Sequence, residues 1–134
     1  MNTFHSDGEA LQALNDVKQN WAMREDAAIY LGSHPTPVNL ERLVEALEDD
    51  SFGVRWTAGV ALASAGDAAL EPLLRALSQR SSAWLREGAH HIFYYSANEH
   101  VSQQTTDLLK AMRGPASDVA TMSLAGKLLR QVKH

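Results

Sequence analysis

The densest group of polar and aromatic side chains in the sequence comprises His90, His91, Tyr94 and Tyr95, and it is preceded by Glu87. This residue stands four positions before His91, so a carboxylate and an imidazole share one side of any helix that contains both. A transition metal could use this pair, but a metal site needs two or more further ligands. The residues expected to face the pair from the preceding helix are Trp56, Gly59 and Val60, which cannot coordinate a metal. We therefore predict neither a metal site nor a cofactor.

Motifs of common catalytic and nucleotide-binding sites are absent from the sequence. There is no Gly-x-Ser-x-Gly elbow, no Gly-rich phosphate loop and no Gly-x-Gly-x-x-Gly. With 0 cysteines, the chain has no thiolate ligand, no cysteine nucleophile and no disulfide. The sequence therefore names no catalytic residue and does not support an enzymatic activity.

Charge and hydropathy argue against nucleic acid and membrane as partners. The chain has 12 Lys and Arg against 16 Asp and Glu, a formal net charge of -4, so it has no basic excess for binding nucleic acid. No apolar run approaches the roughly 18 residues of a membrane-spanning helix, and the N-terminus has no signal-peptide pattern. We expect a cytoplasmic protein that binds neither nucleic acid nor membrane.

Three stretches of the sequence align without gaps, each 31 residues after the one before. Each copy contains a cap-type residue, an apolar residue, an arginine, an alanine and a large apolar residue. The matched columns are Asn20, Ser51 and Ser82; Met23, Val54 and Leu85; Arg24, Arg55 and Arg86; Ala27, Ala58 and Ala89; and Leu31, Leu62 and Phe93. The apolar spacing predicts a helix with one buried face in every copy.

Each repeated helix follows a second amphipathic segment, which predicts antiparallel helix pairs. The cap-type residues begin the second helices, and Gly32 and Gly66 are expected to end the first two. The first helices are expected to begin at Ser6 with Glu9 as a capping box, at Thr36 before Pro37, and at Asp67 ahead of Pro72.

A fourth, weaker copy closes the chain. Its first helix would carry Val101, Leu108, Leu109 and Met112. Its second helix would begin at Ser117 and bury Ala120, Leu124 and Leu128, with Thr121 at the arginine position. We predict one all-α domain, a short α-α superhelix of about four helix pairs, with units at about 6–34, 35–66, 67–97 and 98–134.

The apolar-Arg pair that opens the second helix, followed by small residues and a large apolar one, resembles the HEAT repeat family. The short period is most similar to the bacterial subgroup of phycobilisome-lyase-like HEAT repeats, and the most similar stretch covers residues 43–55. In that family an aspartate commonly stacks with the repeated arginine to form a ladder. Here only Asp49 or Asp50 supplies it, with Gln19 and Ser81 at the matching positions. The resemblance implies that some arginines bind carbonyls or caps instead.

The resemblance also implies that the second helices line an inner, concave wall. The positions opposite the alanine column are unusually apolar and aromatic for a solvent-facing surface. The candidate partner-binding residues are Glu25, Ile29, Trp56, Val60, Glu87, His91, Tyr94 and Tyr95. In the alternative interpretation, Trp56 and Tyr94 pack against neighbouring helices or within an oligomer.

We therefore expect a scaffold or adaptor that binds another protein or peptide of unknown identity. The alternative function is an accessory or chaperone-like subunit related to phycobilisome-type lyases. A third possibility is self-association, because a short solenoid has two open ends whose apolar residues must be covered.

Overall fold

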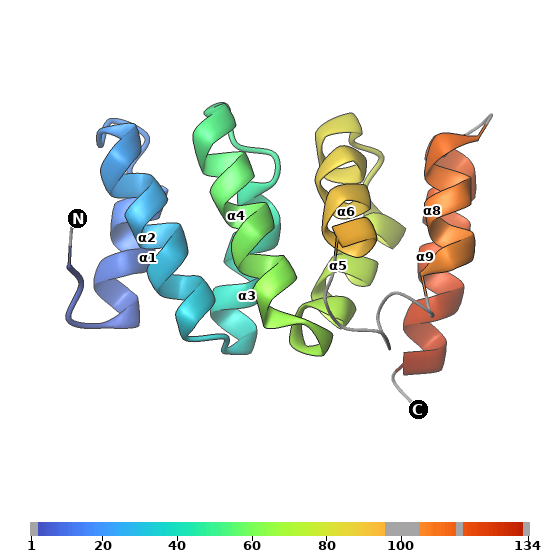
Figure 1. Ribbon diagram of the computed structural model, residues 1–134, viewed down its shortest axis with the longest axis horizontal. Helices are drawn as coiled ribbons and strands as arrows, with labels where there is room; N and C mark the ends of the chain where they lie inside the picture. The colour runs from blue at the N-terminus through green and yellow to red at the C-terminus, as the bar shows by residue number, and fades with distance from the viewer. Residues whose placement is uncertain (1–2, 96–104, 115–116, 133–134) are drawn as a thin grey trace.

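We describe the fold from a computed structural model, which defines residues 3–95, 105–114 and 117–132. Within these residues the chain forms eight α-helices and no strand (Figure 1). In chain order they are α1 (Asp7–Asn15), α2 (Trp21–Ser33), α3 (Pro37–Ala46), α4 (Phe52–Ala65), α5 (Asp67–Gln79), α6 (Ala83–Tyr95), α8 (Thr106–Arg113) and α9 (Ser117–Val132). The chain is an α-α superhelix, as predicted.

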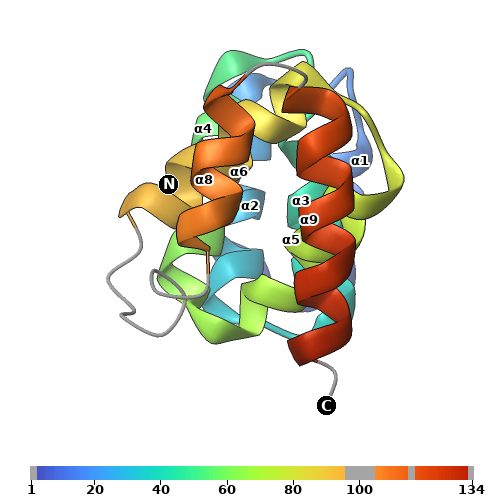
Figure 2. The ribbon, with the colours of Figure 1, turned by 90° about the vertical axis from the view of Figure 1, so that its right-hand side faces the viewer.

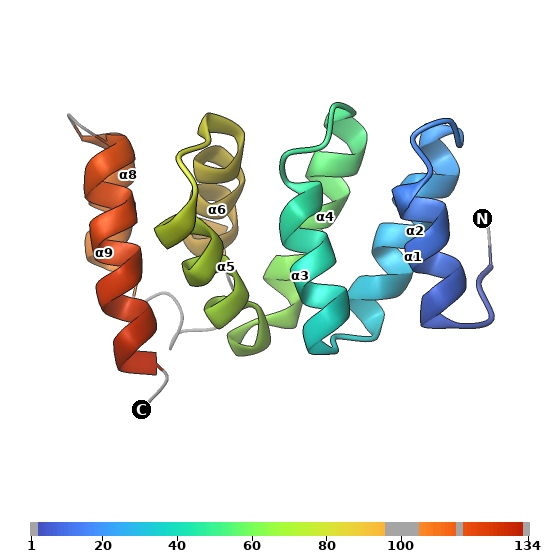
Figure 3. The same ribbon diagram turned by 180° about the vertical axis from the view of Figure 1, so that it is seen from behind.

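The helices form two layers. Helices α2, α4, α6 and α8 lie side by side in one layer, and α1, α3, α5 and α9 form the other (Figures 1 and 2). Seen from behind, α1, α3, α5 and α9 face the viewer (Figure 3). The first three pairs therefore stack in register, with their second helices in one layer and their first helices in the other.

The last two helices reverse the predicted layer order. Helix α8 lies beside α6 in the layer of second helices, whereas α9 packs along α5 in the other layer (Figure 2). The buried residues of α9 are Thr121 and Ala125, while Ala120, Leu124 and Leu128 are half-buried. Leu124 and Leu128 pack against the core as predicted, but the centre of the buried face lies one position further along the helix. Helical periodicity shows which faces are apolar but not which neighbour covers them. Val101 lies outside the described residues.

The second helices begin at the predicted caps. The side-chain oxygens of Asn20, Ser51 and Ser82 accept hydrogen bonds from backbone N–H groups three residues later, at 2.8, 3.5 and 3.2 Å. Ser6 and Thr36 cap α1 and α3 in the same way. These contacts join neighbours in the sequence, so the residue types predict them well.

Two predicted boundaries were wrong. Helix α2 does not end at Gly32 but continues through Ser33. Asp67 does not cap α5: it is the first helical residue and follows Gly66, which has a φ of 61° and provides no side-chain cap. Gly66 does end α4, as predicted, and its left-handed conformation lets α5 begin at the next residue.

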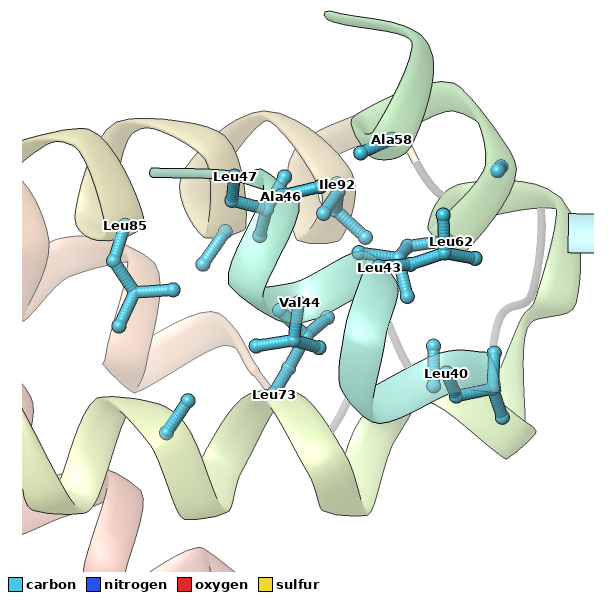
Figure 4. Packing of buried hydrophobic residues seen from close by; sticks show 14 of the residues in the cluster. Leu40, Leu43, Val44, Ala46, Leu47, Ala58, Leu62, Leu73, Leu85 and Ile92 are labelled. Carbon is cyan, nitrogen blue, oxygen red and sulfur yellow. The ribbon is translucent and has the colours of Figure 1, made fainter. Parts of the chain in front are cut away.

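The alanine column lies at the centre of the core. Ala27, Ala58 and Ala89 are all 0% exposed, so the close approach that their small size predicts is confirmed. Leucine and isoleucine side chains from α3, α4, α5 and α6 belong to the same buried cluster as Ala58 (Figure 4). The core therefore runs continuously between the two layers rather than dividing into separate units.

The arginine ladder has one rung among the described residues. Arg24 Nη1 and Nη2 donate to the two carboxylate oxygens of Asp49, at 3.0 and 2.6 Å, and Arg24 Nε and Nη2 also donate to the Leu14 carbonyl. Arg55 donates to the Asp49 carbonyl, and Arg86 donates to a serine hydroxyl. The expectation that some arginines bind groups other than a ladder aspartate is confirmed.

Candidate functional site

The apolar candidate residues lie at exposed positions of one layer, and Ile29 and Val60 occupy equivalent positions in successive repeats. Ile29 of α2, Trp56 and Val60 of α4, and Tyr94 of α6 are exposed by between 46% and 55%. Large apolar side chains normally lose much more of their surface on folding. Their exposure leaves an uncovered apolar strip, which we call the α2–α4–α6 face.

The polar candidate residues differ in their surroundings. Glu87 is exposed, whereas Glu25 and His91 are half-buried. The Glu25 carboxylate accepts a hydrogen bond from the Thr57 hydroxyl at 3.4 Å, so this side chain joins α2 to α4. Tyr95 is the last residue of α6, and its side chain lies outside the described part of the chain.

A groove lies between α4 and α6 on this face. We call it the α4–α6 groove, and its volume is about 330 Å³. Its lining residues are Phe52, Arg55, Trp56 and Gly59 from α4, Trp84, Glu87, Gly88, His90 and His91 from α6, and Leu47, which follows α3. This volume lies at the small end of the range for ligand pockets, so the groove fits a side chain or a short segment.

Aromatic rings form the groove walls. The Trp56 ring lies 6.4 Å from the Phe52 ring and 4.9 Å from the His91 ring, measured between centroids. The Arg55 guanidinium lies 4.1 Å from the centre of the Trp84 ring and 5.6 Å from that of Phe52. Arg55 is held there by hydrogen bonds to the Asp49 and Asp50 carbonyls, so one face of Trp84 is already occupied.

Sequence reasoning missed Phe52, Arg55 and Trp84 as parts of this site. A signal was present for Phe52, because it stands four residues before Trp56 and so shares its side of the helix. Both Phe52 and Trp84 are exposed although they are large aromatic residues. From the sequence, the repeated arginines are expected only to bind a ladder aspartate, carbonyls or caps. Arg24 binds such groups alone, whereas Arg55 also lies over the Trp84 ring.

Residue size distinguishes the contact between α4 and α6, where the groove lies, from the contact between α2 and α4. A Cβ atom added at Gly32 would lie 2.5 Å from the Ala61 Cβ, so α2 and α4 approach closely. One repeat later the equivalent pair is Ala63 and Ile92, whose extra volume holds the helices apart.

A second pair of positions also makes the contact between α2 and α4 close and the contact between α4 and α6 wide. A Cβ atom at Gly53 of α4 would lie 2.7 Å from a Glu25 carboxylate oxygen, so glycine lets the Glu25 side chain lie across the contact. The positions equivalent to Glu25 and Gly53 in the next repeat are Trp56 and Trp84. Trp56 and Trp84 therefore hold α4 and α6 farther apart, and their indole rings line the space between the two helices.

Two glycines have no side chains that would fill the bottom of the groove. A Cβ atom at Gly88 would lie 3.1 Å from the Leu47 Cδ2 atom, and one at Gly59 would lie 4.0 Å from the same atom. The first contact is tight and the second is ordinary van der Waals contact. The missing side chains leave Leu47 as the apolar floor of the groove.

We predict opposite effects for alanine at two helical glycines. Gly59→Ala should stabilise the protein by roughly 0.5–1 kcal/mol, because alanine is a better helix former and its methyl group meets only ordinary contact. Gly32→Ala should destabilise it by about 1–3 kcal/mol, because the methyl group would overlap Ala61. Urea unfolding followed by circular dichroism measures both changes, and equal effects at the two sites would show that α2 and α4 are not tightly packed.

The titratable residues do not form a metal site in the described part of the chain. No group of three or more His, Asp and Glu side chains there lies close enough together to hold a metal ion. None of the described helices has both the length and the apolar character that crossing a bilayer requires. The chemistry that the arrangement does provide is aromatic surface for contact with an apolar group.

Comparison with known proteins identifies the repeats. The family profile described as HEAT repeats matches residues 9–91, which is more than half of the chain and extends from α1 into α6. No curated protein and no solved structure gives a significant match. The matched range contains every residue that lines the α4–α6 groove.

Proposed function

The chain belongs to the HEAT repeat family, and from that premise we propose that it binds a protein or peptide partner through the α4–α6 groove. HEAT repeats generally mediate contacts between proteins, and solenoids use extended faces for this purpose. The partner-binding residues predicted from the sequence would then act together with Phe52, Arg55 and Trp84.

The aromatic lining of the groove carries this proposal. Trp56 is 51% exposed although indole surface is among the most favourable to bury, so the free protein leaves much binding energy unused. Rigid aromatic side chains at the centre of a pocket are typical of interface hot spots. An apolar side chain of the partner would fill the groove above Leu47 and contact Trp56.

Residues beside the groove would extend the contact. Val60 continues the row of Trp56 along α4, and Tyr94 lies near the end of α6. Both are exposed, as is Ile29 on α2. A peptide lying across the layer would therefore meet apolar surface on both sides of the groove.

Peptide display tests the proposal while the partner is unidentified. A random 12-residue phage library is selected on immobilised protein, and fluorescence anisotropy gives the Kd of the leading peptide. Trp56→Ala should weaken binding by at least about 30-fold, which corresponds to roughly 2 kcal/mol for a hot-spot residue. The physical reason is the loss of the desolvated indole face at the centre of the groove.

Trp21→Ala is the matched control. Trp21 is an exposed tryptophan at the start of α2 and does not line the groove, so its loss should change the Kd by less than about twofold. Equal losses in the two variants would place the binding site elsewhere. Circular dichroism of both variants shows whether the fold is intact.

Other parts of the sequence prediction stay predictions. No described residue favours the lyase-related alternative, the phycobilisome-lyase-like subgroup or a particular oligomeric state, and the cytoplasmic location likewise stays a prediction. Sedimentation of the wild type and Trp56→Ala tests self-association directly. A dimer that dissociates in the variant would assign the groove to contact between two copies of the chain.

A further inference from the structure

A second pocket lies one repeat further along the same layer, between α6 and α8. We call it the α6–α8 pocket, and its volume is about 270 Å³. Its lining residues are Ala83, Arg86, Glu87 and His90 from α6, and Met112 and Arg113 from α8. In the aligned repeats, the four α6 residues correspond to Phe52, Arg55, Trp56 and Gly59 of α4. The pocket is therefore the equivalent inter-repeat groove, with Ala83 and Glu87 in place of the aromatic Phe52 and Trp56.

Two arginines bring positive charge to this pocket from different helices. Arg86 Nη1 donates a hydrogen bond to the Ser81 hydroxyl at 3.3 Å, and Arg113 ends α8. Among the described residues neither arginine forms an ion pair with a carboxylate. Glu87 also lines the pocket and is exposed. Two guanidinium groups against one carboxylate leave the pocket with an excess of positive charge.

His90 adds a buried polar atom that is not satisfied. Its Nε2 atom is inaccessible to solvent and has no hydrogen-bond partner in the described structure. Its ring is stacked on the Tyr94 ring, with centroids 6.0 Å apart and planes 9° from parallel. Desolvation lowers the pKa of His90, and the charges of Arg113 and His91 lower it further. A negatively charged group in the pocket would offset the repulsion between protonated His90 and the positive charges of Arg113 and His91.

We propose that the α6–α8 pocket binds a carboxylate of the same partner whose apolar side chain occupies the α4–α6 groove. This inference rests on the proposed function. An arginine guanidinium presents paired N–H donors whose geometry matches a carboxylate, so Arg86 and Arg113 suit this ligand better than a neutral group. His90 lines both the groove and the pocket, which makes the two surfaces continuous.

The repeat geometry sets the distance between the two contacts. The groove and the pocket are equivalent sites displaced by one helix, and helices packed side by side are about 8–10 Å apart. An extended peptide advances about 3.3 Å per residue. The partner segment should therefore carry an apolar residue and an Asp or Glu about three positions apart, in either chain direction.

Selection of the same phage library tests this motif. We expect the wild-type protein to enrich peptides in which a large apolar residue stands three positions from Asp or Glu. The leading peptide is then compared with its Asn or Gln version by fluorescence anisotropy. Neutralising the acid should weaken binding to the wild type at least tenfold, but less than twofold in Arg86→Gln/Arg113→Gln.

Matched variants separate local from general charge effects. Lys127→Gln/Arg130→Gln removes the same two charges from exposed positions of α9 in the opposite layer, and should leave the effect of neutralising the acid unchanged. Arg113→Gln alone removes the exposed arginine at the end of α8 without disturbing the half-buried Arg86. It should reduce affinity several-fold even if the double variant does not fold.

The outcomes distinguish this inference from the function on which it rests. If neutralising the acid changes wild-type affinity by less than twofold while Trp56→Ala still weakens binding at least about 30-fold, the carboxylate site is wrong and the apolar groove stands. An equal loss in Lys127→Gln/Arg130→Gln would also overturn it, because the effect would then come from net charge. If Trp56→Ala has no effect either, the proposed function itself fails.

Discussion

Replacing Asp49 by alanine is expected to lower the free energy of unfolding by about 3–5 kcal/mol. Arg24 is only 5% exposed, and its guanidinium donates to both carboxylate oxygens of Asp49. Removing the carboxylate leaves a buried positive charge with the Leu14 carbonyl as its remaining acceptor. The loss is a large share of the roughly 5–15 kcal/mol that stabilises a typical domain. Urea unfolding at neutral pH measures it.

The neighbouring aspartate provides the control. Asp50 is exposed, so Asp50→Ala should change stability by no more than about 0.5 kcal/mol. Similar losses in both variants would mean that the contact between Arg24 and Asp49 adds nothing specific to the fold.

The pH dependence of this difference has a definite sign. Desolvation raises the pKa of Asp49, but hydrogen bonds from Arg24 and the Ser51 N–H, with the charges of Arg24 and Arg42, lower it more, so the net shift is downward. A depressed carboxyl pKa contributes stability that is complete above the ordinary value and is lost as pH falls through the folded value. The gap between wild type and Asp49→Ala should therefore shrink in acid.

Phe93→Ala is expected to cause a loss of similar size, about 3–5 kcal/mol. Phe93 is 0% exposed and occupies the large apolar column that also contains Leu31 and Leu62. Truncating its ring removes buried apolar surface and leaves a cavity between the two layers, because the surrounding helices relax only in part. Thermal and urea unfolding followed by circular dichroism give the change.

The next residue along α6 offers a matched comparison. Tyr94 is 55% exposed, so Tyr94→Ala should destabilise the protein by no more than about 1 kcal/mol, most of it from the stacked His90 ring. The pair tests the register of α6: a larger loss at Tyr94 than at Phe93 would mean that the helix is rotated and that the α2–α4–α6 face is not where the structure places it.

Local features of the fold could be predicted because residues near in sequence determine them. The caps at Asn20, Ser51 and Ser82 bind N–H groups three residues away. The alanine column follows from the 3.6-residue period of each helix. These signals recur every 31 residues, so each copy supports the interpretation of the others.

Features that depend on the distance between repeats were missed. In the sequence, Gly32 is typical of a helix end. Only the proximity of Ala61 in the structure shows that Gly32 permits close packing of α2 and α4. The α4–α6 groove depends on the distance at which Ala63 and Ile92 hold α4 and α6 apart. The residue pattern of a single helix contains no information on that distance. The layer of α9 was missed for a related reason, since the same apolar face could pack against either neighbour.

The candidate site was predicted only in part for the same physical reason. Exposure of Ile29, Trp56 and Val60 follows from their angle relative to the alanine column. The participation of Arg55 does not, because its guanidinium is directed over Trp84 by carbonyl groups of the preceding loop. Neither the hydrogen bonds nor the ring contact has a signature in residue spacing.

The equivalence of the α4–α6 groove and the α6–α8 pocket has a consequence for how such a chain can diversify. Each site takes four of its lining residues from the helix on one side, so duplication of a single 31-residue unit would add one further site. Substitutions at positions that line one site only, such as Phe52 or Arg86, would then change the preference of that site, whereas Glu87 and His90 contribute to both. Selectivity for longer ligands could thus grow by concatenation, one unit at a time, without redesign of the core.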